Sequence, residues 1–408
     1  MSVLFARQPI FDRSGQVIAY ELLYRSPDHL SHAAGTAVET MASTVIVDAV
    51  LSMGLEQAVD GRIAFLNMPR PHLVGGVVEL LDPAGVVVEI LEDIAPDAEV
   101  LGACQRLRAH GYRLALDDYV AGDPRAGLLG HVDLVKVDVM STDAGALDAL
   151  VRELRGRPTQ LVAEKVEDEA MRDRCVRLGF ELFQGYFFRK PELIQGHDLS
   201  PDVVRALSLM NLLRDPAVPQ AQIVEGFRVD PGLTYKLLRM ANSAAVGARA
   251  VSSIPHAIGL LGRGPLYRWV ALIFAAGAGR AGGTKGELLR EAMIRARFCE
   301  LIAEQAAARA DSGEAFIVGL FSCLEPLLGV PLLTVLEKVR LAAEARAALT
   351  TRSGPLAWVL QLSEAYEAGD WDRVARIAAA AGVGAEATSR TYVEALGWMR
   401  ACLAELEG

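Results

Sequence analysis

The chain has 408 residues, of which 52% are hydrophobic and 23% are charged, so the protein is neither disordered nor of low complexity. This length predicts two or three domains, each large enough to bury a core of its own. The formal net charge of −10 argues against broad electrostatic binding to nucleic acid, and we expect no nucleic-acid partner.

The sequence predicts neither a membrane span nor a secretory signal. The longest uncharged apolar stretch is Trp269–Gly279, which is shorter than the roughly 18–20 residues of a spanning helix, so a buried helix is expected there. The apolar start of the chain is interrupted at Arg7. Five scattered cysteines, without a close pair or a metal-type spacing, are typical of reduced thiols in a cytoplasmic protein.

In the first half, short apolar runs alternate with longer amphipathic segments. The apolar runs predict strands at Ile63–Met68, Val86–Leu91, Arg113–Asp117, Leu134–Asp138, Gln160–Val166 and Leu182–Phe188. The segments between them predict helices at Ala42–Met53, Asp97–His110, Ala144–Arg155 and Glu169–Leu178. This alternation predicts a mostly parallel sheet, and so many units in so short a length fit a closed α/β barrel of the TIM type better than an open sheet.

The pattern changes after the polar stretch Glu192–Pro201, beyond which helical spacing dominates. Helices are expected at Val203–Leu213, Gln222–Phe227, Leu233–Ala241, Ile254–Leu261, Leu266–Ala276 and Glu287–Ala307. We therefore predict an α/β barrel over residues 1–196 and an all-α domain, with a C-terminal helical extension, over residues 197–408.

Polar residues stand at or near the C-terminal ends of the apolar runs of the first half. They are Glu21, Asn67, Glu89, Asp117, Asp118, Lys136, Glu164 and Gln184. In a parallel barrel these ends share one face, where active sites are built. Carboxylates with one amide oxygen suit Mg²⁺ or Mn²⁺, adjacent aspartates suit a pair of ions, and a lysine suits a water or a phosphate. A single strand-end acid is usually a helix cap or a loop residue, so the prediction depends on their joint occurrence.

These residues lie in motifs that resemble the EAL domain, a cyclic di-GMP phosphodiesterase module, and the resemblance covers residues 3–191. In chain order the motifs are Gln8-Pro9-Ile10, Glu21-Leu22-Leu23-Tyr24-Arg25, Phe65-Leu66-Asn67, Val88-Glu89-Ile90-Leu91-Glu92, Asp117-Asp118-Tyr119, Val135-Lys136-Val137-Asp138, Val162-Ala163-Glu164-Lys165-Val166-Glu167 and Gln184-Gly185-Tyr186-Phe187-Phe188.

The resemblance implies a barrel with two divalent ions, Mg²⁺ or Mn²⁺, and a role for each matched residue. The ligands of the first ion would be Glu21, Asn67, Glu89 and Asp117. The second ion would take Asp118 and Glu164, with Asp117 bridging the two ions. Lys136 would orient the attacking water, and Glu164 could act as its base. Contacts to the dinucleotide would come from Gln8, Leu23, Arg25 and Gln184. The loop after the fifth strand would be braced by Glu92 and Glu167.

Two departures from the EAL pattern bear on activity. In the loop after the aspartates, Val120 replaces a glycine, so any positive φ needed there becomes costly. The same loop contains Pro124, which fixes φ and removes a hydrogen-bond donor. We therefore expect slow or regulated hydrolysis. Lys165 replaces a small residue beside Glu164, and strand alternation predicts that its side chain points away from Glu164.

The helical half resembles the HDOD domain, a helical relative of the HD hydrolases, over residues 199–300. The matching segments are Asp230-Pro231-Gly232-Leu233, Leu237–Ser243, Val251–Ile258 and Leu260-Leu261-Gly262. A metal-dependent HD site needs several histidines, but His256 is the only histidine beyond the boundary region, and the His197-Asp198 dipeptide lies in the expected linker. The resemblance therefore implies an interaction or sensory module and no catalyst.

Together the two resemblances indicate the EAL–HDOD, or YuxH-like, family of cytoplasmic bacterial signalling proteins. Two functions stay open from the sequence. The first is an enzyme that hydrolyses cyclic di-GMP, supported by the complete ligand set. The second is a non-catalytic cyclic di-GMP receptor, supported by the altered loop, whose HDOD half engages a protein partner. A homodimer is also expected, because EAL relatives often pair through this loop.

Overall fold

The computed structural model describes residues 4–25, 55–185, 187, 201–244, 251–279, 283–306 and 310–407. The chain forms two compact units. The first unit contains Met1–Lys190, Gly282–Thr284 and Glu364–Gly408, and the second contains Pro191–Ala281 and Lys285–Ser363. These units place the first break after Lys190 and group Gly282–Thr284 and Glu364–Gly408 with the barrel, whereas the predicted division lies between residues 196 and 197.

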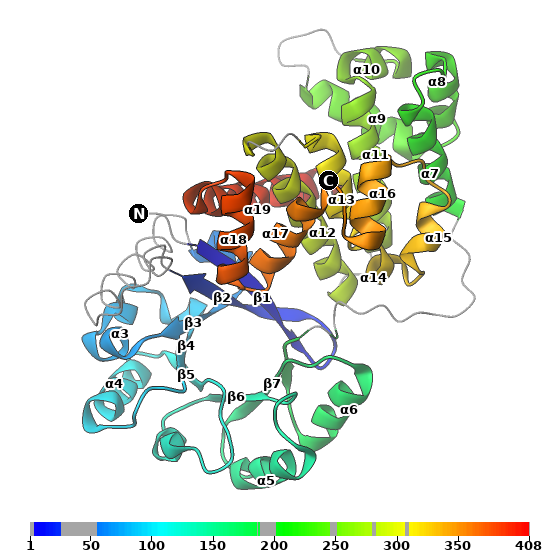
Figure 1. Ribbon diagram of the computed structural model, residues 1–408. Helices are drawn as coiled ribbons and strands as arrows, with labels where there is room; N and C mark the ends of the chain where they lie inside the picture. Colours follow the sequence, from blue (N-terminus) through cyan, green and yellow to red (C-terminus); the bar gives the residue numbers. More distant parts are fainter. Residues whose placement is uncertain are drawn as a thin grey trace. The chain divides into compact units, whose positions relative to one another are not determined.

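The first unit is built around a closed barrel of eight strands in sequential order (Figure 1). The strands are β1 (Leu4–Asp12), β2 (Val17–Arg25), β3 (Ile63–Met68), β4 (Val86–Ile90), β5 (Arg113–Leu116), β6 (Leu134–Asp138), β7 (Gln160–Glu164) and β8 (Leu182–Phe183). β1 is antiparallel to both β2 and β8, and all other neighbours are parallel. The predicted barrel and its six predicted strands are confirmed, although β8 is short.

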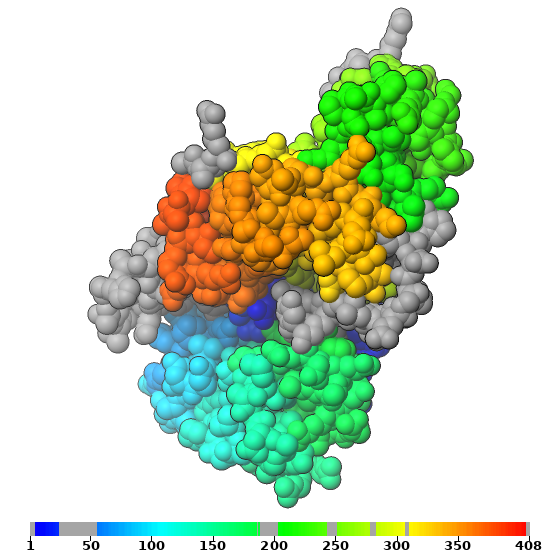
Figure 2. All heavy atoms as spheres, turned by 45° about the vertical axis from the view of Figure 1, so that its right-hand side comes forward, coloured from blue at the N-terminus to red at the C-terminus, as the bar shows by residue number. Residues whose placement is uncertain are grey.

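Helices cover the outside of the barrel between successive strands. They are α2 (Leu55–Ala58), α3 (Arg70–Gly75), α4 (Ala98–Ala109), α5 (Ala144–Leu154) and α6 (Glu169–Leu178), with short 3-10 helices η2 (Val77–Leu80), η3 (Pro83–Gly85) and η4 (Pro124–Leu128). α4, α5 and α6 each begin after an aspartate whose side chain accepts first-turn N–H groups, namely Asp97, Asp143 and Asp168. Figure 2 shows the segments from α4 to α6, coloured cyan to green, as one continuous outer surface. The predicted helix Ala42–Met53 lies outside the described residues.

The interior of the barrel contains a layer of apolar side chains to which every strand contributes one residue. The layer consists of Ile10, Ala19, Phe65, Val87, Ala115, Leu134, Val162 and Leu182. These side chains are nearly fully buried, so the barrel has a packed core and no central channel at this level.

Two C-terminal helices, α18 (Trp371–Ala381) and α19 (Ala385–Glu407), belong to the barrel unit. The ring of Phe5 on β1 meets Tyr392 of α19 edge-on, with the ring centroids 5.6 Å apart. Tyr392 in turn packs on Tyr366, whose ring meets Trp371 edge-on at 5.2 Å. Since all four rings are more than nine-tenths buried, this aromatic cluster is part of the core of the barrel unit.

The second unit is entirely helical over its described residues, as predicted. Its helices are α7 (Pro201–Arg214), α8 (Gln220–Arg228), α9 (Pro231–Ala244), α10 (Ile254–Leu261), α11 (Arg263–Gly279), α12 (Gly283–Gln305), α13 (Ser312–Phe321), α14 (Leu324–Leu328), α15 (Leu332–Leu336), α16 (Ala343–Thr351) and α17 (Ala357–Glu367). The first two residues of α12 and the last four of α17 belong to the barrel unit. α12 and α13 cross closely, because a Cβ on Gly319 would lie 2.7 Å from the Cα of Ala296. No helix in the described part of the chain is both long and apolar enough to cross a membrane.

Candidate active site in the barrel

A second interior layer of the barrel is entirely polar. Each member lies two positions along its strand from a member of the apolar layer, on the same face of the sheet. The polar layer consists of Gln8, Glu21, Asn67, Glu89, Asp117, Lys136, Glu164 and Gln184. Strand geometry therefore brings together seven of the eight predicted strand-end residues, with Gln8 added by the antiparallel strand β1, whereas Asp118 lies outside the layer.

Lys136 lies at the point where the acidic side chains of this layer converge. Its Nζ is 2.7 Å from Glu89 Oε1, 2.8 Å from Asp117 Oδ1, 2.9 Å from Glu164 Oε1 and 3.2 Å from Glu21 Oε2. The whole residue is buried. A single ammonium thus holds four carboxylates from strands β2, β4, β7 and the end of β5.

Amide side chains fix the orientation of Glu21 in the polar layer. Asn67 Nδ2 donates to Glu21 Oε1 at 3.1 Å, and Gln184 Nε2 donates to Glu21 Oε2 at 2.9 Å. Gln184 Nε2 also donates to Gln8 Oε1 at 2.9 Å. Gly185 allows this placement of Gln184, because a Cβ at its φ of 146° would lie 2.3 Å from the backbone nitrogen of Val166.

The layer carries an excess of negative charge, and the pKa values of Glu89, Glu164 and Lys136 are raised. Burial, together with the charge of Glu21, raises the pKa of Glu89 well above its usual range. Burial also raises the pKa of Glu164 to about 8, although Lys136 acts in the opposite sense. Burial alone would lower the pKa of Lys136, but the surrounding carboxylates, first Glu21 and then Glu89, raise it well above its usual value. The site therefore favours additional positive charge.

The chemistry of the polar layer fits a hard divalent cation. Carboxylate and amide oxygens are the ligands that Mg²⁺ and Mn²⁺ prefer. Two such oxygens, Asn67 Oδ1 and Glu89 Oε2, are buried and have no hydrogen-bond partner among the described residues. Within the same residues, no three Asp, Glu, His or Cys side chains form a ready metal site, since the ammonium of Lys136 stands where the carboxylates converge.

Comparison with known sequences finds a domain family that matches each half of the chain. The EAL domain matches residues 3–191 and the HDOD domain matches residues 199–351. YuxH of Bacillus subtilis, an uncharacterized protein, is 30% identical over 98% of each chain. Cyclic di-GMP phosphodiesterase CdgJ of Vibrio cholerae is 33% identical over 96% of this chain and 91% of its own. The chain belongs to the EAL–HDOD family.

A solved structure of the YkuI protein of Bacillus subtilis, which has an EAL domain and is in complex with its substrate c-di-GMP and calcium, is also similar. It is 20% identical, with a TM-score of 0.39, over 64% of this chain and 72% of that chain.

In the EAL domain of this protein, Arg125 holds the loop that carries the two aspartates. Its guanidinium pairs with both carboxylate oxygens of Asp123, at 3.0 and 2.7 Å. Nη1 donates to the carbonyl oxygen of Ile90 on β4 at 3.1 Å, and Nη2 donates to that of Asp117 at 2.8 Å. The sequence reasoning missed Arg125. The Asp-Pro start of η4 signals a turn, but no sequence pattern indicated that the guanidinium would be buried.

The strain expected at Val120 is not found. Val120 does not have a positive φ, whereas Asp118 does, with φ of 45°, and so does Gly122, with φ of 75°. The loop thus closes through the second aspartate and the glycine that remains, and Val120 is half exposed. Backbone strain at Val120 therefore gives no support to slow hydrolysis, which stays a prediction.

Lys165 points away from the polar layer, as alternation predicts. Its Nζ pairs with Asp138 Oδ2 at 2.5 Å, and both side chains lie near Asp118. Burial, followed by the charge of Asp117, raises the pKa of Asp118, and Lys165 opposes this shift. Lys165 itself has a positive φ of 56°.

Besides Asp118, four of the residues singled out by resemblance lie outside the polar layer. Leu23 follows Glu21 on β2 and contacts the turn at Gly369, which precedes α18. Arg25 ends β2, and its side chain lies outside the described residues. Glu92 and Glu167 are exposed, so their role in bracing the loop stays a prediction.

The HDOD domain shows no HD-type metal site over its described residues. His256 lies in the first turn of α10 and is exposed, and its backbone N–H bonds the capping Ser253 Oγ at 3.4 Å. Asn242 lies near the end of α9. Its amide bonds both the N–H and the carbonyl of Val251, at 2.7 and 2.8 Å. The His197-Asp198 dipeptide lies outside the described residues.

Proposed function

We propose that the EAL domain hydrolyses cyclic di-GMP to the linear dinucleotide at the polar layer of the barrel. The observation that carries the proposal is the convergence of four carboxylates on the buried Lys136, at the end of the barrel where the parallel strands terminate. A relative that matches nearly the whole chain, CdgJ, is a cyclic di-GMP phosphodiesterase. The acids, amides and lysine of the layer all lie within residues 3–191, the range that the EAL domain matches.

The proposal includes two divalent ions, Mg²⁺ or Mn²⁺. The first would be held by Glu21, Asn67, Glu89 and Asp117. The second would be held by Asp118 and Glu164, with Asp117 shared. When bound, the ions supply positive charge that offsets the phosphate and lowers the pKa of a bound water.

The chain's own residues orient the reactants. Lys136 donates a hydrogen bond to the attacking water, and Glu164 accepts its proton. The water oxygen forms a bond to one phosphorus while the bond from that phosphorus to the ribose 3′ oxygen breaks, and the released 3′ oxygen takes a proton from solvent. Gln8, Leu23, Arg25 and Gln184 contact the dinucleotide and hold the scissile phosphate over the layer.

We further propose that the HDOD half controls this reaction through the β1–β2 hairpin. After Lys190 the chain leaves the barrel unit, and two later segments, Gly282–Thr284 and Glu364–Gly408, belong to it again. At the first, Thr284 Oγ1 donates to the carbonyl oxygen of Gly15 in the hairpin turn at 3.3 Å. At the second, Gly369 touches Leu23. The same hairpin carries Gln8 and Glu21, so a displacement transmitted at either place would reach the polar layer.

The test is to incubate the full-length protein with cyclic di-GMP and Mn²⁺ and to follow the linear dinucleotide by chromatography. Asp117→Asn and Glu21→Ala should abolish its formation, and Asp173→Asn, an exposed change on α6, should not. Wild-type turnover no higher than that of Asp117→Asn, with cyclic di-GMP still bound, would reject hydrolysis and leave the receptor function. A homodimer and a protein partner for the HDOD domain remain predictions.

A further inference from the structure

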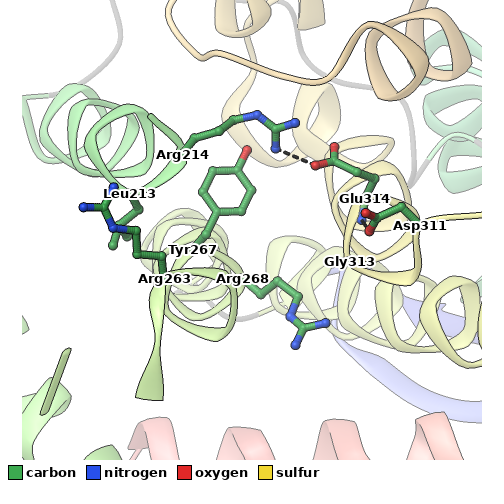
Figure 3. Close-up of a pocket in the computed structure, with 9 residues that line it drawn as sticks. Leu213, Arg214, Arg263, Tyr267, Arg268, Asp311, Gly313 and Glu314 are labelled. Atoms are coloured by element: carbon green, nitrogen blue, oxygen red, sulfur yellow. Dashed lines mark hydrogen bonds and ion pairs between the residues drawn. The ribbon is translucent and has the colours of Figure 1, made fainter. Parts of the chain in front are cut away.

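A pocket of about 510 Å³ lies within the HDOD domain, between the end of α7, the start of α11 and the start of α13 (Figure 3). A volume of this size is typical of small-molecule sites. Three arginines and two acids, Asp311 and Glu314, line the pocket, so its lining carries one positive charge in excess in a chain whose net charge is −10. The arginines are Arg214, Arg263 and Arg268.

The carboxylates nearby neutralise this positive charge only in part. Arg214 pairs with Glu314 of α13, at 2.5 Å between Nη1 and Oε1. Arg268 pairs with Glu300, but Glu300 also takes Arg297 at 2.6 Å, so that one carboxylate serves two guanidiniums. Arg263 donates to the backbone carbonyls of two residues after α7, and these oxygens carry no net charge. An anion would therefore gain from entering this pocket.

The start of α13 adds hydrogen-bond donors to the same wall. The carboxylate of Asp311 accepts the N–H of Glu314 at 3.0 Å and caps the helix. Gly313 follows in the first turn and presents backbone without a side chain. A Cβ there would lie 3.2 Å from Asp311 Oδ1 and 3.9 Å from Arg268 Nη1. Arg268 thus lies beside the positive end of a ten-residue helix.

Tyr267 is the independent sign of a ligand. It is only 7% exposed and lines the pocket, and Figure 3 shows its ring projecting from α11 between Arg214 and Glu314. Its hydroxyl lies beside the Arg214 guanidinium but has no hydrogen-bond partner of normal geometry among the described residues. Because a buried hydroxyl without a partner is costly, a ligand atom that bonds it would remove that cost.

We propose that this pocket binds a small phosphate-bearing molecule of about mononucleotide size. Arg268 and the first turn of α13 receive the phosphate, whose several oxygens suit several donors. The Tyr267 hydroxyl donates to the bound molecule, and Arg214 and Arg263 add positive charge. The site would make the HDOD domain a sensor of a soluble phosphate compound, and it does not depend on hydrolysis in the barrel.

Calorimetry on the full-length protein tests the site, with inorganic phosphate and 5′-AMP as probes. EDTA is present throughout, so that metal-dependent binding in the barrel makes no contribution. At least one probe should bind the wild type. Tyr267→Phe should weaken that binding by about tenfold, and Arg268→Gln should weaken it further. Tyr235→Phe, a change at an exposed tyrosine of α9, is the matched control and should leave affinity unchanged.

Thermal unfolding separates a binding role of Tyr267 from a structural one. Without a probe, Tyr267→Phe should unfold at the wild-type temperature or above it, because the hydroxyl has no partner to lose. If only inorganic phosphate binds, the site recognises the phosphate group by itself. If only 5′-AMP binds, the site needs the larger molecule. The proposal is overturned if neither probe binds at millimolar concentration, if adenosine binds as well as 5′-AMP, or if Tyr267→Phe and Arg268→Gln bind like the wild type.

Discussion

Arg125 and Asp123, two residues apart in the loop after β5, form an ion pair that is almost entirely buried. The pair reaches beyond the loop, since Arg125 also bonds the backbone of Ile90 on β4 and of Asp117. The position of Asp117 in the polar layer is therefore tied to a guanidinium outside that layer.

Arg125→Met should lower the free energy of unfolding by about 3–5 kcal/mol, because it leaves the Asp123 carboxylate buried without its partner. The double variant Asp123→Asn/Arg125→Met should be more stable than Arg125→Met, since it removes the unpaired charge. Denaturant unfolding monitored by circular dichroism measures both. A double variant less stable than the single one would show that the ion pair is not the source of the loss.

Lys136→Met removes the ammonium from the point where four carboxylates converge. Without divalent ions, the variant should lose about 3–5 kcal/mol, because the carboxylates stay buried without their counter-charge. Saturating Mn²⁺ should then raise its unfolding temperature more than it raises that of the wild type, because the cation replaces the lost charge. Lys165→Met, at an exposed lysine, serves as the control. Equal gains from Mn²⁺ in wild type and Lys136→Met would argue against a cation site in the polar layer.

Gly369→Ala should weaken cyclic di-GMP binding several-fold by displacing Leu23. A Cβ on Gly369 would lie 2.9 Å from Leu23 Cδ1. Gly61→Ala is a matched control, because Gly61 has the same φ of 69° but nothing within 4 Å of its Cβ position. Both changes should cost about 1–2 kcal/mol of stability through backbone strain. Calorimetry measures the affinity of both variants for cyclic di-GMP. Equal affinities would show that Leu23 does not contribute to binding.

Tyr392→Ala should destabilise the barrel unit by about 3–5 kcal/mol, because it removes a buried ring from the cluster with Phe5 and Tyr366. The control is Tyr235→Ala, at a tyrosine that is 63% exposed, and its effect should stay within about 0.5 kcal/mol. Thermal and denaturant unfolding compare the two. Similar, small losses would mean that the C-terminal helices contribute little to the barrel.

The barrel and its polar layer could be predicted because both follow from strand periodicity. The apolar residue and the polar residue on each strand are two positions apart, so one alternation places Phe65 and Asn67, or Val162 and Glu164, on the same interior face. The EAL motifs then supplied the roles of these residues. The arrangement around Lys136 was not predictable, because nothing in the sequence says that four carboxylates bond the lysine directly.

The remaining surprises depend on contacts between distant parts of the sequence. No local sequence pattern indicates that Phe5 packs on Tyr392. From the sequence, α18 and α19 could be predicted only as further helices of the second half. The loop after β5 was misjudged for a related reason. The missing glycine was visible, but in this chain the positive φ lies at Asp118, and the buried guanidinium of Arg125 supports the loop.

The return of the chain to the barrel makes the second unit, in topological terms, an insertion between the barrel strands and their own last helices. During synthesis the strands emerge first, yet Phe5 meets Tyr392 only when almost the whole chain has been made. The core of the barrel unit is therefore incomplete until the HDOD domain and the helices that follow it have been translated. A message cut short within the HDOD region would yield a barrel without Tyr366, Trp371 and Tyr392 of its aromatic cluster, so it would not release a stable EAL domain on its own.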